Sequence, residues 1–434
     1  MRNAGHMNWS QLLVLLCILT PASAAFAQQW GQAAPAGASS QSSPSSPTAS
    51  AASQSGASQS GAQQPGGLSL KIMDVLIIAH PSMQIEFQNN DNLYSTPGNR
   101  VSDQAVVLKP ALRLETRTGG NNSYSVYLNP NLGQFQQHKS DSYNDYTAGG
   151  LANLDLSTRL RARVSAEFMS GHDARGSTNN PLSAEPDRYH SLAGRGVLSY
   201  GATGARGRID FELGQLRRTY SNNRGITAAS DSTASDIGAT FFWRIGPKTE
   251  LLFQGKHGSV EYALTTQERD STENRFLAGA VWEATAKTRG TFRIGMAKKE
   301  FVDAARQGGT AVTWEGQIRW SPRSYSHVDV NLIKTPAETT GGVGNFIDST
   351  TTGMIWTHDW TRLISTAATV NYLSSAYQGI ARTDNTLTYG LKATMKMRRW
   401  LSLGADYSNS ARTSSDSNFD YKRNLFMLFL NATL

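Results

Sequence analysis

The stretch Asp236-Ile-Gly-Ala-Thr-Phe-Phe-Trp-Arg-Ile245 alternates between apolar and polar side chains. Its apolar positions are Ile237, Ala239, Phe241, Trp243 and Ile245, and its polar or small positions are Asp236, Gly238, Thr240 and Arg244. Only Phe242 breaks the order. Because successive side chains of a β-strand point to opposite faces, this period of two predicts a strand with one apolar and one polar face.

The same period recurs along the chain from about residue 80 onward, for example in Leu160–Phe168 and Thr313–Trp320. The alternating segments run for about 10 to 13 residues, which is long for a soluble sheet and fits tilted strands that cross a bilayer. No apolar run reaches the roughly 18 residues that a membrane-spanning helix needs. The pattern therefore favours a membrane protein built from strands.

The connections between these segments are short and long in turn. The short ones are Gly246–Lys248, Ser321–Ser324, Asp359–Arg362 and Met397–Trp400, and the long ones include His172–Asp187, Tyr220–Thr233, Pro336–Phe346 and Ala411–Asp420. Short turns at one rim and long loops at the other are typical of an outer-membrane barrel, whose turns face the periplasm.

Four tryptophans mark a repeat that spans two strands, one turn and one loop. Trp243, Trp282, Trp320 and Trp356 recur at intervals of 36 to 39 residues, each before a short turn. A propeller blade has a similar period but needs four short strands in it, whereas each period here holds two long ones. We interpret the four tryptophans as an aromatic girdle at one membrane interface.

The prediction for residues 75–434 is an all-β fold, a transmembrane antiparallel up-and-down β-barrel. The alternating segments number about 18, and 16 stays open, because outer-membrane barrels have an even number of strands. An even number also places both ends of the barrel at the rim of the short turns.

The N-terminal part predicts export from the cytoplasm. Arg2, a short apolar core and Ala25-Phe-Ala27 have the pattern of a cleaved signal peptide over residues 1–27. Residues 28–74 begin as an Ala-, Ser-, Gln-, Gly- and Pro-rich stretch, which predicts a disordered periplasmic linker. The one cysteine, Cys17, lies within the signal peptide, so the mature chain is predicted to have no disulfide, thiolate metal site or cysteine nucleophile.

Motifs for chemistry are weak. The His residues show no metal-ligand spacing, and Gly201-x-x-Gly204-x-x-Gly207 lies between two alternating segments, which indicates a turn and not a phosphate loop. His172, Asp173, His190 and Ser191 do not have a spacing that demands catalysis. We therefore expect no enzyme and no cofactor. The net charge of +8 comes without a basic aromatic patch, so nucleic acid is not an expected partner.

If the apolar face meets outer-membrane lipid, the polar face lines a lumen. The basic candidates for that lining are Lys109, Arg113, Arg161, Arg163, Arg195, Arg208, Arg244, Arg275, Arg293, Arg319 and Lys392. They are interleaved with acidic residues along the strands. Two interpretations stay open, a channel selective for anions or acidic glycans, and mixed charges that keep the lumen wet without selectivity.

Several segments resemble the EpsL-like, BBP2-type β-barrel porins of exopolysaccharide gene clusters. They are Pro81–Tyr94, His172-Asp-Ala-Arg-Gly176, Tyr200–Arg208, the Trp-containing turns with Pro and a basic residue, and the end around Arg412–Asn424. The resemblance covers roughly residues 75 to 434. It implies export of exopolysaccharide or capsule polymer, with polysaccharide and periplasmic export components as partners. No active-site residues come with it.

Three functions follow as hypotheses for a Gram-negative outer membrane. The first is a channel that exports a nascent polysaccharide, the second is a general porin for small solutes, and the third is a structural or adhesive barrel with a plugged lumen. In each case we expect the barrel assembly machinery to insert the chain.

Overall fold

The computed structural model describes residues 67–72, 75–119, 121–285, 287–340 and 343–434. The predicted signal peptide, 1–27, and linker residues 28–66 lie outside the described residues. Among the described residues, no helix is both long and apolar enough to cross a membrane.

Strands account for most of the described chain. They are β1 Leu68–Ile72, β2 Val75–Asn90, β3 Asp103–Arg117, β4 Ser123–Phe135, β5 Tyr143–Asp155, β6 Leu160–Asp173, β7 Asp187–Tyr200, β8 Gly207–Tyr220, β9 Ser232–Gly246, β10 Thr249–Tyr262, β11 Ser271–Thr285, β12 Thr288–Phe301, β13 Gly309–Arg323, β14 Ser326–Ala337, β15 Phe346–Asp359, β16 Ile364–Gln378, β17 Arg382–Lys396, β18 Leu401–Ser414 and β19 Tyr421–Thr433. Short helical turns lie in the long loops: η2 Lys139–Asp141, α2 Arg224–Thr227, η3 Ala228–Ser230, η4 Thr265–Gln267 and η5 Ser417–Phe419.

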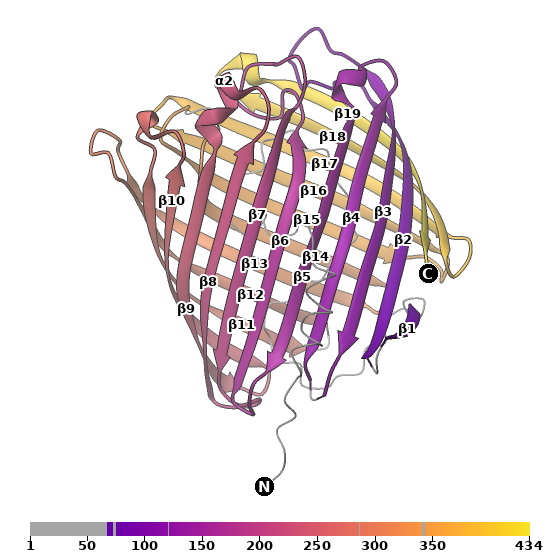
Figure 1. Cartoon of the computed structure of the whole chain (residues 1–434), viewed down its shortest axis with the longest axis vertical. Coiled ribbons are helices and arrows are strands. Elements are labelled where there is room, and N and C mark those ends of the chain that lie inside the picture. Colours follow the sequence, from indigo (N-terminus) through magenta and orange to yellow (C-terminus); the bar gives the residue numbers. More distant parts are fainter. Residues whose placement is uncertain (1–66, 73–74, 120, 286, 341–342) are drawn as a thin grey trace.

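The strands form one closed antiparallel wall (Figure 1). From β2 to β19 each strand pairs with the next one along the chain, and β19 then pairs with β2 over Ser82–Asn90. Leaving β1 aside, the nineteen strands give eighteen in the closed wall. The predicted barrel of about 18 strands is therefore confirmed, and the alternative of 16 is wrong. Both ends of the wall lie at the rim of the short turns, because Thr433 is the register partner of Ser82.

Strand β1 was not foreseen, since it lies within residues 28–74, the segment predicted to be a linker. It pairs only with β2, from Leu68 opposite Ala79 to Ile72 opposite Val75. The last residue of β19, Thr433, lies opposite Ser82. Residues 75–81 of β2 therefore extend beyond the part of β2 that pairs with β19. Strand β1 thus hydrogen-bonds to an edge that would otherwise stay unpaired. The prediction of a linker stays a prediction for residues 28–66.

The alternation seen in the sequence becomes the two faces of the wall. On the outer face apolar side chains are strongly exposed, as in Phe276 at 68% and Leu213 at 63%. Their neighbours Arg275 and Glu212 point to the other face, where they form ion pairs. An apolar band around a polar interior is the pattern of a barrel surrounded by lipid.

The closing strand β19 departs from simple alternation. Its outward residues Phe426 and Leu428 are exposed, as the sequence indicates. Its other face is also apolar, because Leu425, Met427 and Phe429 are all buried. The inner face of β19 is therefore apolar and packed, between the polar inner faces of its neighbours.

Inside the wall, Tyr143 on β5 lies over Gly133, its register partner on β4. A Cβ atom at position 133 would come within 2.3 Å of the Tyr143 ring, which supplies its three nearest atoms. An aromatic ring that covers a cross-strand glycine helps to pin the strand register.

We predict that Gly133→Ala destabilises the barrel by about 1–3 kcal/mol, the usual cost of overpacking. Adding Tyr143→Ala should remove most of that penalty, because the clash is with this one ring. Urea unfolding of the single and double variants, refolded in lipid, measures the coupling. If the two effects simply add, the ring does not set the packing at this site.

Candidate functional site

The inner face of the barrel is revealed by side chains that reach past a neighbouring strand. Arg275 on β11 donates hydrogen bonds to Glu315 on β13 at 2.9 Å and to Thr335 on β14 at 2.6 Å. Side chains that skip one or two strands come within reach on the concave side of a curved sheet, where they converge. By strand alternation the same face carries all the basic candidates, namely Lys109, Arg113, Arg161, Arg163, Arg195, Arg208, Arg244, Arg275, Arg293, Arg319 and Lys392.

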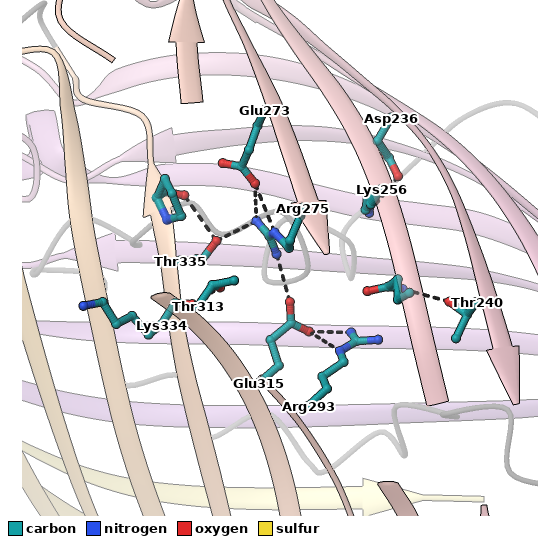
Figure 2. A network of polar contacts seen from close by, with 12 residues as sticks. Asp236, Thr240, Lys256, Glu273, Arg275, Arg293, Thr313, Glu315, Lys334 and Thr335 are labelled. Carbon is teal, nitrogen blue, oxygen red and sulfur yellow. Dashed lines mark hydrogen bonds and ion pairs between the residues drawn. The ribbon is translucent and has the colours of Figure 1, made fainter. Parts of the chain in front are cut away.

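The centre of this face is a network of compensated charges (Figure 2). Glu315 lies between two guanidinium groups, accepting from Arg275 at 2.9 Å and from Nε of Arg293 at 3.0 Å. Arg275 also donates to Glu273. Two arginines and two carboxylates thus neutralise one another on adjoining strands.

Most other basic candidates also lie beside a carboxylate. The pairs are Lys109–Glu86 at 2.6 Å, Arg113–Glu115 at 2.6 Å, Arg195–Glu212, Arg208–Asp210 at 3.2 Å, Arg244–Glu250 at 3.0 Å and Arg319–Asp329 at 2.5 Å. Lys392 is the register partner of Asp406. Opposite charges in contact satisfy one another in a partly dehydrated lumen. This arrangement fits a wet lumen at least as well as a selective one, and the functional role of the candidates stays a prediction.

The remaining two candidates donate hydrogen bonds to carbonyl or amide oxygen atoms. Arg161 donates to the carbonyl oxygen of Gly201 at 3.3 Å, and Arg163 donates to Oδ1 of Asn153 at 2.9 Å. Both are on β6, on the half of that strand nearest the short turns.

At the rim of the long loops, the segment between β6 and β7, residues 174–186, is held by Arg175. Its Nε donates to Oδ1 of Asp141 at 2.8 Å, and its Nη2 contacts both Asp141 and the Tyr94 hydroxyl. The guanidinium also lies 4.2 Å from the centre of the Tyr94 ring. At Gly176 φ is +74°, and a Cβ there would lie 1.8 Å from the Tyr94 carbonyl oxygen, so only glycine fits.

Electrostatics keep this anchor in one protonation state at neutral pH. Hydrogen bonding to Asp141 raises the pKa of Arg175 above its usual value. Burial and the Asp141 carboxylate raise the pKa of Tyr94 to about 12, so its hydroxyl stays protonated. The anchor is therefore a charged guanidinium between a carboxylate and a neutral phenol.

The same segment reaches strands almost diametrically across the barrel. The backbone N–H of Asn179 donates to Oγ1 of Thr340 at 3.2 Å, and its side-chain amide donates to the Tyr377 hydroxyl at 3.1 Å. Tyr377 is on β16, eight strands from β6 by the shorter way round the wall. Residues 174–186 therefore cross the mouth of the lumen.

A second anchor continues this crossing. Arg269, in the loop between β10 and β11, is only 2% exposed. It donates to the carbonyl oxygens of Thr339 at 2.5 Å and Ala229 at 2.7 Å, and it lies over the Tyr262 ring at 4.0 Å. We call residues 174–186, 338–340, Arg269 and Ala229 the mouth belt. The sequence predicted long loops here, but composition carries no signal for contacts between loops that are far apart in the chain.

The four tryptophans of the predicted girdle lie beside the short turns. Trp243, Trp320 and Trp356 are on the outer face with exposed side chains. Trp282 is partly exposed. Trp360 and Trp400, which the sequence analysis did not single out, are also exposed at this rim. The girdle function stays a prediction.

The residues weighed for catalysis make separate contacts. His172 lies 2.9 Å from Asp145, and Tyr220 donates to Asp173 at 2.7 Å. His190 stacks on Phe168 on the outer face. Within the described residues, no three His, Cys, Asp or Glu side chains gather in a way that could hold a metal ion.

Charge compensation at Glu315 gives a test of ion selectivity. Glu315→Gln should leave Arg275 and Arg293 in excess and shift the reversal potential in a salt gradient towards anion preference. Arg293→Gln should shift it towards cations. Glu300→Gln is the control, since Glu300 pairs with Lys298 and both are exposed on the outer face of β12. Equal reversal potentials in all variants would mean that these side chains do not face the ion path.

The mouth belt gives a second prediction. Arg175→Gln should loosen residues 174–186 and raise single-channel conductance and open-state noise, because charge-assisted hydrogen bonds are worth about 1.5–3 kcal/mol each. Lys139→Gln removes the same charge at an exposed position of a neighbouring loop and should change neither quantity. Unchanged conductance in Arg175→Gln would show that the belt does not restrict the mouth.

The chain is similar to several solved structures of outer-membrane proteins. OpdO of Pseudomonas aeruginosa is 15% identical, with a TM-score of 0.46 over 82% of this chain and 97% of that one. OpdK of the same organism, solved with vanillate, is 12% identical, with a TM-score of 0.48 over 82% and 99%. A BenF-like porin from Pseudomonas fluorescens Pf-5 is 9% identical, with a TM-score of 0.47 over 82% and 99%.

No curated protein matches the sequence. The family model described as "Putative beta-barrel porin 2" matches residues 77–434, which is the whole closed wall apart from the first residues of β2. The barrel and this match indicate an outer-membrane protein, and the chain belongs to that family of β-barrel porins.

Proposed function

We propose that the protein is a passive outer-membrane channel for small hydrophilic solutes. The observation that carries this proposal is the mouth belt, in which Asn179 hydrogen-bonds to Thr340 and Tyr377 on the far wall. A belt fixed at both ends narrows the opening. This suits small solutes better than a continuous polymer, whose passage would require the belt to leave its anchors.

The inner wall supports the same proposal. Ion pairs such as Arg275–Glu315 and Lys256–Asp236, at 2.7 Å, give this wall a polar surface close to neutrality. Such a surface keeps water in the lumen without holding one class of solute strongly. The family match to β-barrel porins is consistent with diffusion as the mode of transport.

Export of exopolysaccharide, which the sequence resemblance implies, is the second candidate. It rests on that resemblance and requires the belt to open. The third, a structural or adhesive barrel, requires the belt and the other loops to seal the lumen completely. The three differ in what they let through.

Planar-bilayer recording with purified, folded protein tests the proposal. We expect stepwise, ohmic conductance, and liposome swelling that is fast for monosaccharides and slow for oligosaccharides. A closed trace from folded protein would favour the sealed barrel. Swelling that does not depend on solute size would count against a narrow mouth.

Deleting the gene separates solute diffusion from export. Under the proposal, surface polysaccharide is unchanged and uptake of small solutes slows. Loss of surface polysaccharide, restored by the wild-type chain but not by a variant that locks the belt across the mouth, would favour export instead.

A further inference from the structure

A hollow of about 320 Å³ lies on the outer face of the wall, over β15 to β19, in the half nearest the short turns. Small side chains form its floor, because Ala393 on β17 is the register partner of Thr366 on β16 and of Ala405 on β18. Larger apolar side chains surround it and are themselves exposed, with Leu391 at 64% and Phe426 at 46%. We call this hollow in the lipid-facing surface the outer hollow.

Hydrogen bonds fix the aromatic side chains beside the outer hollow. Nε1 of Trp356 donates to Oγ of Ser326 at 3.0 Å, and Nε1 of Trp360 donates to Oγ1 of Thr366 at 2.9 Å. The His358 ring is centred 5.6 Å from the ring of Trp356 and 4.4 Å from that of Trp360. Because these rings are held before any ligand arrives, little conformational entropy is lost when a ligand packs against them.

Positive charge lies at the rim next to the outer hollow. The turn after β15 contains Arg362, and the turn after β17 contains Arg398 and Arg399. All three are exposed, and within the described part of the chain none of them forms an ion pair shorter than 4 Å. Two carboxyl groups share this rim, that of Asp359, which belongs to the inner face of β15 by alternation, and that of the last residue, Leu434, at the seam. An anionic group at this level of the outer face therefore has three exposed guanidinium groups in two neighbouring turns.

The spacing between the outer hollow and these arginines fits a single lipid molecule. From Ala393 to Arg398 the chain covers at most about 16 Å along the strand direction, and less along the membrane normal because the strands of such barrels are tilted. This depth lies within one leaflet of the hydrocarbon core, which is about 15 Å thick. With a headgroup at the level of the turns, an acyl chain that runs along β17 reaches the outer hollow.

We propose that the outer hollow and the arginines beside it bind an anionic phospholipid of the leaflet on the side of the short turns. The outer hollow takes part of one acyl chain, and Arg362, Arg398 and Arg399 take the phosphate of the headgroup. Guanidinium groups match phosphate oxygens in geometry and charge, and basic residues at a membrane surface attract anionic lipids. A zwitterionic headgroup binds less well, because the same arginines repel its ammonium group. The site goes beyond the proposed channel, since a lipid can bind to the outer face whether or not the lumen conducts.

Native mass spectrometry of the purified, folded full-length barrel tests the site. The probes are phosphatidylglycerol and cardiolipin as anionic lipids and phosphatidylethanolamine as the zwitterionic comparison, with the same acyl chains and at equal concentrations. We expect phosphatidylglycerol, cardiolipin or both to stay bound at least about fivefold more than phosphatidylethanolamine. A preference for only one of the two anionic lipids would identify that lipid as the ligand. Equal retention of all three, or of none, would overturn the proposal.

The variant Ala393→Leu/Ala405→Leu fills the outer hollow from its floor. Retention of the preferred anionic lipid should fall at least about tenfold, because the acyl chain loses its apolar contacts there. The control Ala278→Leu/Ala280→Leu places the same side chains on the outer face of β11 and should keep retention within about twofold. Heat-modifiable migration on a gel shows that each variant is folded. Equal losses in the two folded variants, or no loss in either, would show that the outer hollow does not hold the lipid.

The variant Arg398→Gln/Arg399→Gln tests the recognition of the headgroup. The preference for anionic over zwitterionic lipid should fall at least about threefold, because two of the three guanidinium groups are lost. The control Arg159→Gln/Lys248→Gln removes two exposed cations from short turns elsewhere on the same rim and should keep the preference. Equal losses in both variants would show that net charge, and not this site, selects the lipid. A stable oligomer that forms without lipid, and that filling the outer hollow breaks, would assign the outer hollow to a second copy of the chain and overturn the proposal.

Discussion

Every other feature of this molecule depends on closing the sheet between β2 and β19. A bilayer offers no water to backbone N–H and C=O groups, so an open edge in the wall would carry a row of unpaired donors and acceptors. The seam over Ser82–Asn90 removes that edge. Once the wall is closed, strand alternation decides which side chains meet lipid and which face the lumen, and the loops and turns are sorted to opposite rims.

The pairing of charges on the inner face has a similar cause, since a charged side chain that loses water needs an opposite charge or a hydrogen-bond partner. Side chains such as Glu315 are held in the lumen by two opposite charges, so the central wall is polar but nearly neutral. Four arginines, among them Arg161 and Arg206, gather around Glu250 where β6 to β10 approach the short turns. The two ends of the lumen are therefore different, with hydrogen-bonded loops across one mouth and a cluster of arginine side chains at the other.

The alternation of apolar and polar residues predicted the strands of the wall well, but it did not predict the contacts between the loops. Side chains alternate between the two faces of every strand of the wall. A short segment such as Asp236–Ile245 is therefore enough to indicate a strand and to show which residues share a face. The contact between Asn179 and Tyr377 joins residues 198 positions apart, and nothing in either neighbourhood signals the other. The burial of Met427 and Phe429 on the inner face of β19 was not predicted for a related reason, because tertiary structure decides what packs against a strand.

The seam also makes the wall a ring without a privileged first strand. The N–H of Leu434 donates to the carbonyl oxygen of Pro81 at 3.2 Å, so the last residue of the wall lies one hydrogen bond from the strand that begins it. All other pairings in the ring join strands that are consecutive in the chain. The architecture is thus compatible with circular permutation, in which a new start at an exposed loop tip would exchange one hairpin for a seam and leave the remaining pairings as they are.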